Sequence, residues 1–188
     1  LDEMKPHFDE AVASGRAVGV ALGLKNSGLG NGFKEITRAV VRFRSDGIVE
    51  VRHGWTEMGQ GVNTVAQQVV VHELGIDPDR IRVIVDTTRE LGFGQTTGSR
   101  GTLMGAGAVK DACDVARRAG CAVDVDHVGE YRVDWTDKLG DVENPTIHST
   151  FGYACQMVVA DPADGSIERV VAAHDVGRAV NPTLCEGQ

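Results

Sequence analysis

Gly54-Trp55-Thr56-Glu57-Met58-Gly59-Gln60-Gly61 joins a predicted strand to a predicted helix, and a second stretch of the same kind follows it, Gly94-Gln95-Thr96-Thr97-Gly98-Ser99-Arg100-Gly101. Each stretch combines glycines with hydrogen-bonding side chains. Backbone N–H groups at such a strand-to-helix junction can approach an anionic or polar ligand. Two loops of this kind in one chain indicate a single shared ligand.

The residues after the first loop recur at helical spacing and predict an amphipathic helix over residues 61–74, ended by Gly75. A strand over residues 81–86 and a helix over about residues 102–119 come next, so the order strand, polar loop, helix occurs twice. The apolar positions of the first helix are Val62, Val65, Ala66, Val69, Val70 and Leu74.

Apolar and charged side chains alternate in the residues before the first loop, over 36–44 and 48–53, on either side of Ser45-Asp46-Gly47. This pattern is typical of a hairpin with one buried and one solvated face. A second hairpin is predicted over 150–160 and 166–174.

The remaining segments complete the predicted architecture. A short helix over residues 2–13 would bury Met4, Phe8, Ala11 and Val12, and residues 17–24 form a buried strand before a glycine-rich loop over 25–34. Tyr131, Val133 and Trp135 alternate with charged residues in a further strand. We therefore expect an α+β fold in two small lobes, with mixed or antiparallel sheets covered by two or three helices.

Composition limits the class of protein. The chain has 188 residues, 41% of them hydrophobic and 24% charged, which suits one domain or two packed lobes. A net charge of -8 without a Lys/Arg-rich run argues against nucleic acid as a partner. No apolar run reaches the roughly 20 residues of a membrane helix, and no signal peptide is visible at the start, so we expect no membrane partner and a cytoplasmic location.

The cysteines are scattered and form no CxxC pair, so the sequence predicts reduced thiols and neither a zinc site nor an iron–sulfur cluster. They are Cys113, Cys121, Cys155 and Cys185. The chain begins at Leu1 and stops directly after an apparently structured segment, which favours a piece of a larger protein.

Local patterns alone leave the function open. A glycine pair before a helix is also ordinary turn chemistry, and Thr and Ser residues often only cap helices. Neither loop continues into the Gly-Lys-Ser/Thr of a P-loop, and no GxGxxG lies between a strand and a helix.

Taken in order, however, four segments resemble the cofactor-binding segments of the molybdenum hydroxylases, the family of xanthine dehydrogenase and aldehyde oxidase. The resemblance covers nearly the whole chain and implies that residues 1–188 are part of the molybdopterin-binding domain, a second-half-type lobe truncated at its C-terminus. The loop over 25–32 is most similar to bacterial xanthine dehydrogenase-type proteins, including selenium-dependent ones. The four segments are residues 56–61, residues 95–100, Asp175-Val176-Gly177 with Asn181-Pro182, and Gly187-Gln188.

The resemblance implies a molybdenum-pterin cofactor, of the molybdopterin cytosine dinucleotide type in bacteria. A Gln amide can hydrogen-bond both the donors and the acceptors of a pterin edge. A helix N-terminus can bind a phosphate group. Gly98, which has no Cβ, would let the cofactor approach the backbone closely. The positions that match cofactor-contacting residues are Met58, Gly59, Gln60, Gly61, Thr96, Thr97, Gly98, Ser99 and Gln188.

Other positions depart from the family pattern. Gly101 stands where many members have a second serine, and Leu29 falls near the aromatic residue that sandwiches planar substrates. The regions that carry the family's catalytic glutamate and the glutamine near the metal are not in this chain, so we assign no catalytic residue and no metal ligand. Glu57 is interpreted as a helix cap; His53, His72 and His174 are interpreted as structural.

For the intact protein the resemblance implies oxidative hydroxylation of an N-heterocycle such as a purine, or of an aldehyde, with water as the oxygen source. Iron–sulfur centres and FAD are expected on other domains or subunits, together with the rest of the molybdenum subunit. The chain alone is expected to be inactive, and to self-associate as a homo-oligomer or expose an apolar patch. The alternative is a non-catalytic α+β module that binds a partner or handles a cofactor.

Overall fold

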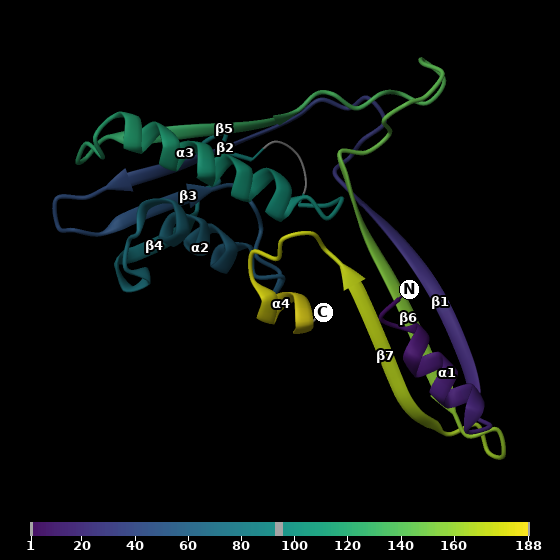
Figure 1. The fold of residues 1–188 in the computed structure, drawn as a ribbon. Helices are drawn as coiled ribbons and strands as arrows, with labels where there is room; N and C mark the ends of the chain where they lie inside the picture. The colour runs from purple at the N-terminus through teal and green to yellow at the C-terminus, as the bar shows by residue number, and fades with distance from the viewer. Residues whose placement is uncertain (1, 93–95, 188) are drawn as a thin grey trace. The chain divides into compact units, whose positions relative to one another are not determined.

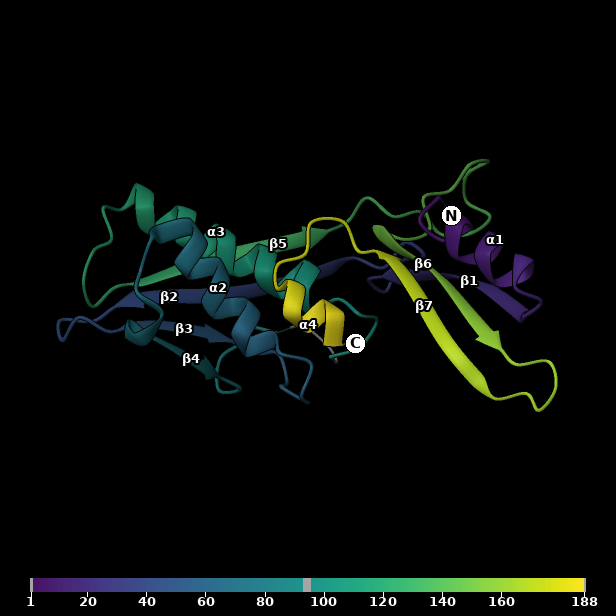
Figure 2. The ribbon, with the colours of Figure 1, turned by 60° about the horizontal axis from the view of Figure 1, so that its bottom comes forward.

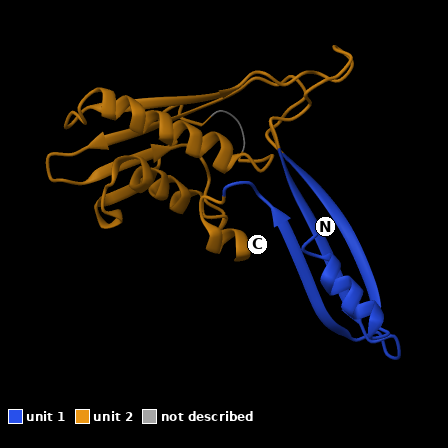
Figure 3. Cartoon of the chain, in the orientation of Figure 1, with its two compact units in different colours: residues 1–26, 151–178 blue, residues 27–150, 179–188 orange. Residues whose placement is uncertain are grey.

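The chain crosses three times between two units, one formed by residues 1–26 with 151–178 and the other by residues 27–150 with 179–188 (Figure 3). We call them unit 1 and unit 2. The computed structural model describes residues 2–92 and 96–187. The two units correspond to the two lobes expected from the sequence.

Unit 1 is a three-stranded sheet with one helix, α1 (Lys5–Ala13). The strand order is β1-β6-β7, and β6 and β7 pair antiparallel as the predicted hairpin. Its strands are β1 (Ala17–Ser27), β6 (Thr150–Ala160) and β7 (Ile167–Asp175). Its buried core consists of Met4, Ala11, Cys155, Met157 and Val159.

Two of the four residues predicted to form the buried face of the first helix are exposed. Met4 and Ala11 are buried, but Phe8 is 40% exposed and Val12 is 52% exposed. The helix therefore buries only a narrow stripe. At the C-terminus of α1 the Ser14 hydroxyl bonds the carbonyl oxygens of Glu10 and Ala11, as a capping side chain does.

Unit 2 is built on a four-stranded sheet in the order β4-β3-β2-β5 (Figure 1). The β2–β3 and β2–β5 pairs are antiparallel, whereas β3 and β4 are parallel. Parallel neighbours need a crossover connection, which the helix α2 and a short 3₁₀ turn provide. The bounds are β2 (Glu35–Phe43), β3 (Val49–His53), α2 (Val62–Leu74), the turn Pro78–Arg80, β4 (Ile81–Val85) and β5 (Asp126–Val133).

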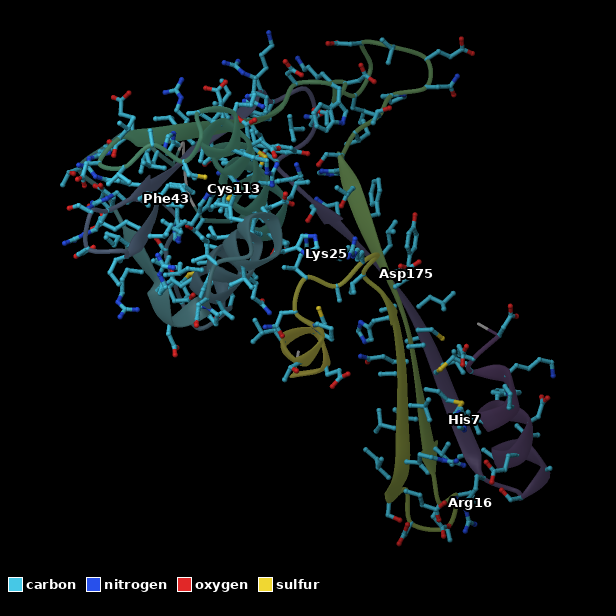
Figure 4. The ribbon with its side chains drawn as sticks, turned by 60° about the vertical axis from the view of Figure 1, so that its left-hand side comes forward. His7, Arg16, Lys25, Phe43, Cys113 and Asp175 are labelled. Atoms are coloured by element: carbon cyan, nitrogen blue, oxygen red, sulfur yellow. The ribbon has the colours of Figure 1, made fainter. Side chains whose placement is uncertain are left out.

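Two helices, α2 and α3 (Gly107–Arg118), lie side by side over one face of this sheet (Figure 2). A Cβ built on Gly129 of β5 would lie 2.1 Å from the backbone nitrogen of Ala112, so only glycine lets α3 come this close to the sheet. Cys113, labelled in Figure 4, is fully buried in this core. The core residues are Ala39, Val41, Val49, Val51, Ala66, Val70, Ile81, Ala108, Val109, Ala112 and Cys113.

The opposite face of the sheet is charged, as the hairpin pattern predicted. Arg52 of β3 bonds Glu50 at 2.7 Å and Asp86, just after β4, at 3.2 Å. Arg38 of β2 bonds Glu130 of β5 at 2.8 Å. The Arg38–Glu130 pair joins two strands and the Arg52–Glu50 pair lies within β3, so each charge has an oppositely charged partner.

Two predicted boundaries and one unexpected helix need correction, and the strand β1, expected to be buried, is mostly exposed. The strand expected around residues 131–135 runs from Asp126 to Val133, because its register pairs Asp126 with Arg42 and Val133 with Glu35. The helix expected from residue 102 begins with a π-helical turn, Gly101–Ala106, before α3. The helix α4 (Pro182–Gly187) was not expected.

Candidate functional site

The first glycine loop ends at the N-terminus of α2, where Gly61 has φ +82° and Glu57 supplies the cap. Oε1 of Glu57 accepts hydrogen bonds from the N–H groups of Gly59 and Gly61, both at 2.9 Å, and Oε2 accepts one from Asn63 at 3.0 Å. These bonds, the one from Asn63 foremost, lower the pKa of Glu57. The interpretation of Glu57 as a helix cap is confirmed.

This cap determines what a ligand of the first loop would have to replace. The N–H groups of Gly59 and Gly61 were expected to face an anionic ligand, but both are bonded to the Glu57 carboxylate. The dipole of α2 attracts an anion to its N-terminus, and in this structure that anion is the Glu57 carboxylate. A phosphate at this position would have to displace Glu57.

Gln60 also bonds within its own loop. Its Oε1 accepts a hydrogen bond from the Met58 N–H at 2.6 Å, and its Nε2 donates to the Thr56 carbonyl oxygen at 2.7 Å. The side chains of Gln60 and Met58 are nevertheless exposed. A ligand that binds the Gln60 amide would exchange these two bonds for its own.

The second loop lies beside the first. The Oγ1 atom of Thr96 accepts a hydrogen bond from the Thr56 N–H at 3.0 Å. Thr97 and Ser99, which follow on the same loop, are exposed. The structure therefore brings together two predicted segments that are separate in the sequence, and it leaves hydroxyl side chains exposed on the second.

A third segment, residues 27–30, packs against the second loop. The Gly28 N–H donates to the Gly98 carbonyl oxygen at 2.9 Å, and the Ser27 hydroxyl donates to the Ser99 carbonyl oxygen at 2.6 Å. Gly98 has φ +67°, and a Cβ there would lie 3.2 Å from the Gly28 carbonyl oxygen. The missing Cβ of Gly98 makes room for Gly28, and a cofactor contact at Gly98 stays a prediction.

Sequence reasoning missed a buried ion pair below these loops. Arg100 Nη1 lies 2.8 Å from Glu35 Oε1, and both side chains are at most 3% exposed. The guanidinium carbon of Arg100 lies 5.3 Å from the ring centroid of Trp55. Arg100 is the last residue of the segment 95–100, but the sequence analysis gave it no role. Its position between small residues and an apolar helix is the sequence feature that could have predicted its burial.

His53 is buried directly before the first loop. Its Nδ1 accepts a hydrogen bond from the Trp55 N–H at 3.1 Å, and burial lowers the pKa of the ring. A neutral ring that accepts a backbone bond is a structural histidine, in agreement with the sequence interpretation. Within residues 2–92 and 96–187, no three His, Cys, Asp or Glu side chains are grouped closely enough to hold a metal ion.

The C-terminal segment of unit 2 packs against α2. Asn181 Nδ2 donates to Gln68 Oε1 at 3.1 Å, and a Cβ on Gly61 would lie 2.6 Å from Leu184 Cδ1. Gln188 lies outside the described residues, as do Gly94 and Gln95 of the second motif. In the described part of the chain no helix is long and apolar enough to span a membrane.

Comparison with known proteins identifies the fold and the family. A family model of the molybdopterin cofactor-binding domain matches residues 2–130 and 121–188. The chain therefore belongs to this domain family of the molybdenum hydroxylases. The fold resembles the aldehyde oxidoreductase of Desulfovibrio desulfuricans, with a TM-score of 0.79 and 22% identity over 99% of this chain and 24% of that one.

Curated relatives cover several activities. The gamma subunit of the 6-hydroxypseudooxynicotine dehydrogenase complex of Paenarthrobacter nicotinovorans is 28% identical over 94% of this chain and 27% of its own length. Aldehyde oxidase 1 of Cavia porcellus is 30% identical over 86% of this chain and 14% of its own length. Nicotinate hydroxylase of Emericella nidulans is 28% identical over 80% of this chain and 14% of its own length. The chain thus spans about a quarter or less of these relatives.

Proposed function

We propose that this chain supplies part of the binding site for a molybdenum-pterin cofactor, through residues 58–61 and 96–99. The observation that carries the proposal is the hydrogen bond from the Thr56 N–H to Thr96 Oγ1 at 3.0 Å. It joins the two loops that the family resemblance assigns to one cofactor. Gln188 is proposed as a further contact.

The chemistry of these side chains fits such a group. The Gln60 amide carries a donor and an acceptor on one exposed side chain, and the pterin edge offers both in return. The hydroxyls of Thr97 and Ser99 can donate to phosphate oxygens from the exposed face of the second loop. When bound, the cofactor would supply two-electron redox chemistry; this chain's residues would hold and orient it.

For the whole protein we propose a molybdenum oxidoreductase that hydroxylates an N-heterocycle such as a purine, or an aldehyde, with water as the oxygen source. The names of the relatives, which include nicotinate hydroxylase and aldehyde oxidase, support this range of substrates. The cofactor is proposed to be of the molybdopterin cytosine dinucleotide type. A cytoplasmic location is proposed as well.

Further partners follow from the same proposal. Two relatives are named as a complex's gamma subunit and as a large subunit, which supports assembly with other chains. We expect iron–sulfur and flavin groups on those chains or on further domains, and the rest of the molybdenum subunit beside this one. By itself the chain should not retain the cofactor and should be inactive.

One observation favours the alternative, a non-catalytic module. Glu57 already occupies the N-terminus of α2, and the Gln60 amide is bonded within its own loop. A loop that satisfies its own hydrogen bonds needs no ligand to do so.

Metal and pterin analysis separates these functions. Molybdenum would be measured by inductively coupled plasma mass spectrometry, and pterin by fluorescence after acid oxidation, on the chain alone and on the protein expressed with its neighbouring sequence. We expect both in the longer protein and neither in the chain alone. Gln60→Ala should lower both in the longer protein, whereas Gln156→Ala, an exposed glutamine on β6, should not. Absence from the longer protein would favour the non-catalytic module.

A further inference from the structure

We propose that the buried pair Glu35–Arg100 is the positioning device that holds the three loops of the site in one arrangement. The pair links residues 27–30, residues 96–99 and Trp55 of the first loop. Its consequence for cofactor binding rests on the proposed function; the geometric role does not.

Glu35 anchors two of the loops with one carboxylate. Its Oε1 accepts a hydrogen bond from Arg100 Nη1 at 2.8 Å, and its Oε2 accepts one from the Leu29 N–H at 2.9 Å. Glu35 is at the start of β2 and only 2% exposed, so it is held by the sheet. The loop containing Leu29 and the segment that follows Ser99 are therefore fixed to the same strand.

Arg100 connects the first loop through Trp55. Its guanidinium carbon lies 5.3 Å from the Trp55 ring centroid, within the range of a cation–π contact. Trp55 is 3% exposed, and a Cβ on Gly105 would lie 3.1 Å from its ring. The Trp55 ring thus contacts both the π-helical turn and the guanidinium, directly before Thr56.

Among the described residues, direct bonds between the loops lie both at the buried Gly28 and at the surface. They include the Gly28–Gly98 backbone bond and the bond from Ser27 to the Ser99 carbonyl. A surface bond such as the one from Ser27 exchanges readily with water unless the backbone beside it is fixed. The buried pair lies below both segments and joins them by charge-assisted hydrogen bonds, which are shorter and stronger than neutral ones.

Stability alone does not require a charged pair at this position. A buried ion pair can often be replaced by apolar side chains of similar volume without loss of stability, whereas removal of one partner leaves an uncompensated charge. An apolar pair would keep the packing but could not accept the Leu29 N–H. The specific contribution of Glu35 and Arg100 is therefore the geometry of the loops.

The test compares four forms of the protein expressed with its neighbouring sequence and prepared without molybdenum. They are the wild type, Glu35→Met/Arg100→Met, Glu35→Gln, and a control, Arg38→Met/Glu130→Met, which removes the partly exposed β2–β5 ion pair. Hydrogen exchange of peptides covering residues 27–30 and 96–100 would be measured by mass spectrometry. Circular dichroism would confirm that each form is folded.

We expect exchange in both peptides to be about 10-fold or more faster in the apolar double variant, and unchanged in the control. Unchanged exchange in a folded apolar variant would overturn the proposal. If that variant does not fold, Glu35→Gln decides: its amide keeps the size of Glu35 but one of its two polar atoms is a donor, so the Leu29 or Arg100 bond is lost. Unchanged loop exchange in Glu35→Gln would then overturn the proposal.

Molybdenum content of the same forms, grown with molybdate, separates this inference from the proposed function. Faster loop exchange together with lower molybdenum content supports both. Faster exchange with wild-type molybdenum content supports the positioning role of Arg100 and Glu35, and counts against the loops as the cofactor site.

Discussion

Gly98 and Gly28 are in backbone contact: the Gly98 carbonyl accepts the Gly28 N–H at 2.9 Å, and a Cβ on Gly98 would lie 3.2 Å from the Gly28 carbonyl oxygen. Two glycine-containing segments far apart in the sequence thus form one surface. The left-handed backbone of Gly98, φ +67°, turns the second loop towards this contact.

Gly98→Ala should destabilise unit 2 through both strain and crowding. The left-handed conformation alone costs an alanine about 1–2 kcal/mol, and the new Cβ would also press on Gly28. Gly120→Ala is the matched control, because Gly120 has φ +65° and open space around its Cβ position. Urea unfolding should give a larger loss for Gly98→Ala; equal losses would show that the contact with Gly28 is not tight.

Glu57→Ala should remove the cap of α2 and cost about 1 kcal/mol, as capping substitutions do. Glu57→Gln should cost less, because the amide oxygen still accepts. Thermal unfolding at neutral pH measures the difference, with the exposed Glu143→Ala as the control. A Glu57→Ala variant as stable as this control would contradict the capping role.

The His53 ring should make stability depend on pH near its ordinary pKa of 6.5. Burial lowers the folded-state pKa, so the unfolded chain binds the extra proton first. The stabilisation is complete above this pH and is lost as the pH falls below it, with a slope of at most about 1.4 kcal/mol per pH unit. In His53→Gln, unfolding free energies measured between pH 5 and 7.5 should depend less on pH; an unaltered slope would contradict this.

The cysteines should differ sharply in reactivity. Cys113 is fully buried, and burial raises the pKa of its thiol to about 12, whereas Cys185 on α4 is exposed. Iodoacetamide at pH 8, followed by peptide mass spectrometry, should label Cys185 in the native chain and Cys113 only after unfolding. Rapid native labelling of Cys113 would show that the α3 face opens.

The exposed side chains Val20, Leu22 and Leu24 lie on one face of β1 and should promote association of the isolated chain. Leu22→Lys should reduce the average mass in sedimentation velocity experiments. Ile167→Lys, at another exposed apolar position on β7, is the control. A monomeric wild-type chain would contradict this prediction.

Much of the fold could be predicted because periodicity is local. The alternation over residues 36–53 and the helical spacing over 62–74 identified β2, β3 and α2 nearly to their ends. Boundaries that depend on a partner were predicted less well. β5 extends from Asp126 because β2 pairs with it along its length, and the Trp135 alternation did not contain that information.

The candidate site shows the same division. The resemblance of residues 56–61 and 96–99 to cofactor-binding segments came from residue order alone, and whether they contact a cofactor stays a prediction. The hydrogen bond between Thr56 and Thr96 that joins the two loops could be seen only in the folded chain. So did the bonds that Gln60 makes within its own loop.

The sequence by itself determined the family, the α+β class and the segments to inspect, because motif order and hydrophobic period are properties of the linear chain. Only the tertiary structure decided which N–H groups Glu57 occupies, why residue 98 is glycine, and that Arg100 pairs with Glu35. The physical reason is that hydrogen bonds and buried charges depend on distances between residues far apart in the sequence, and folding alone sets those distances.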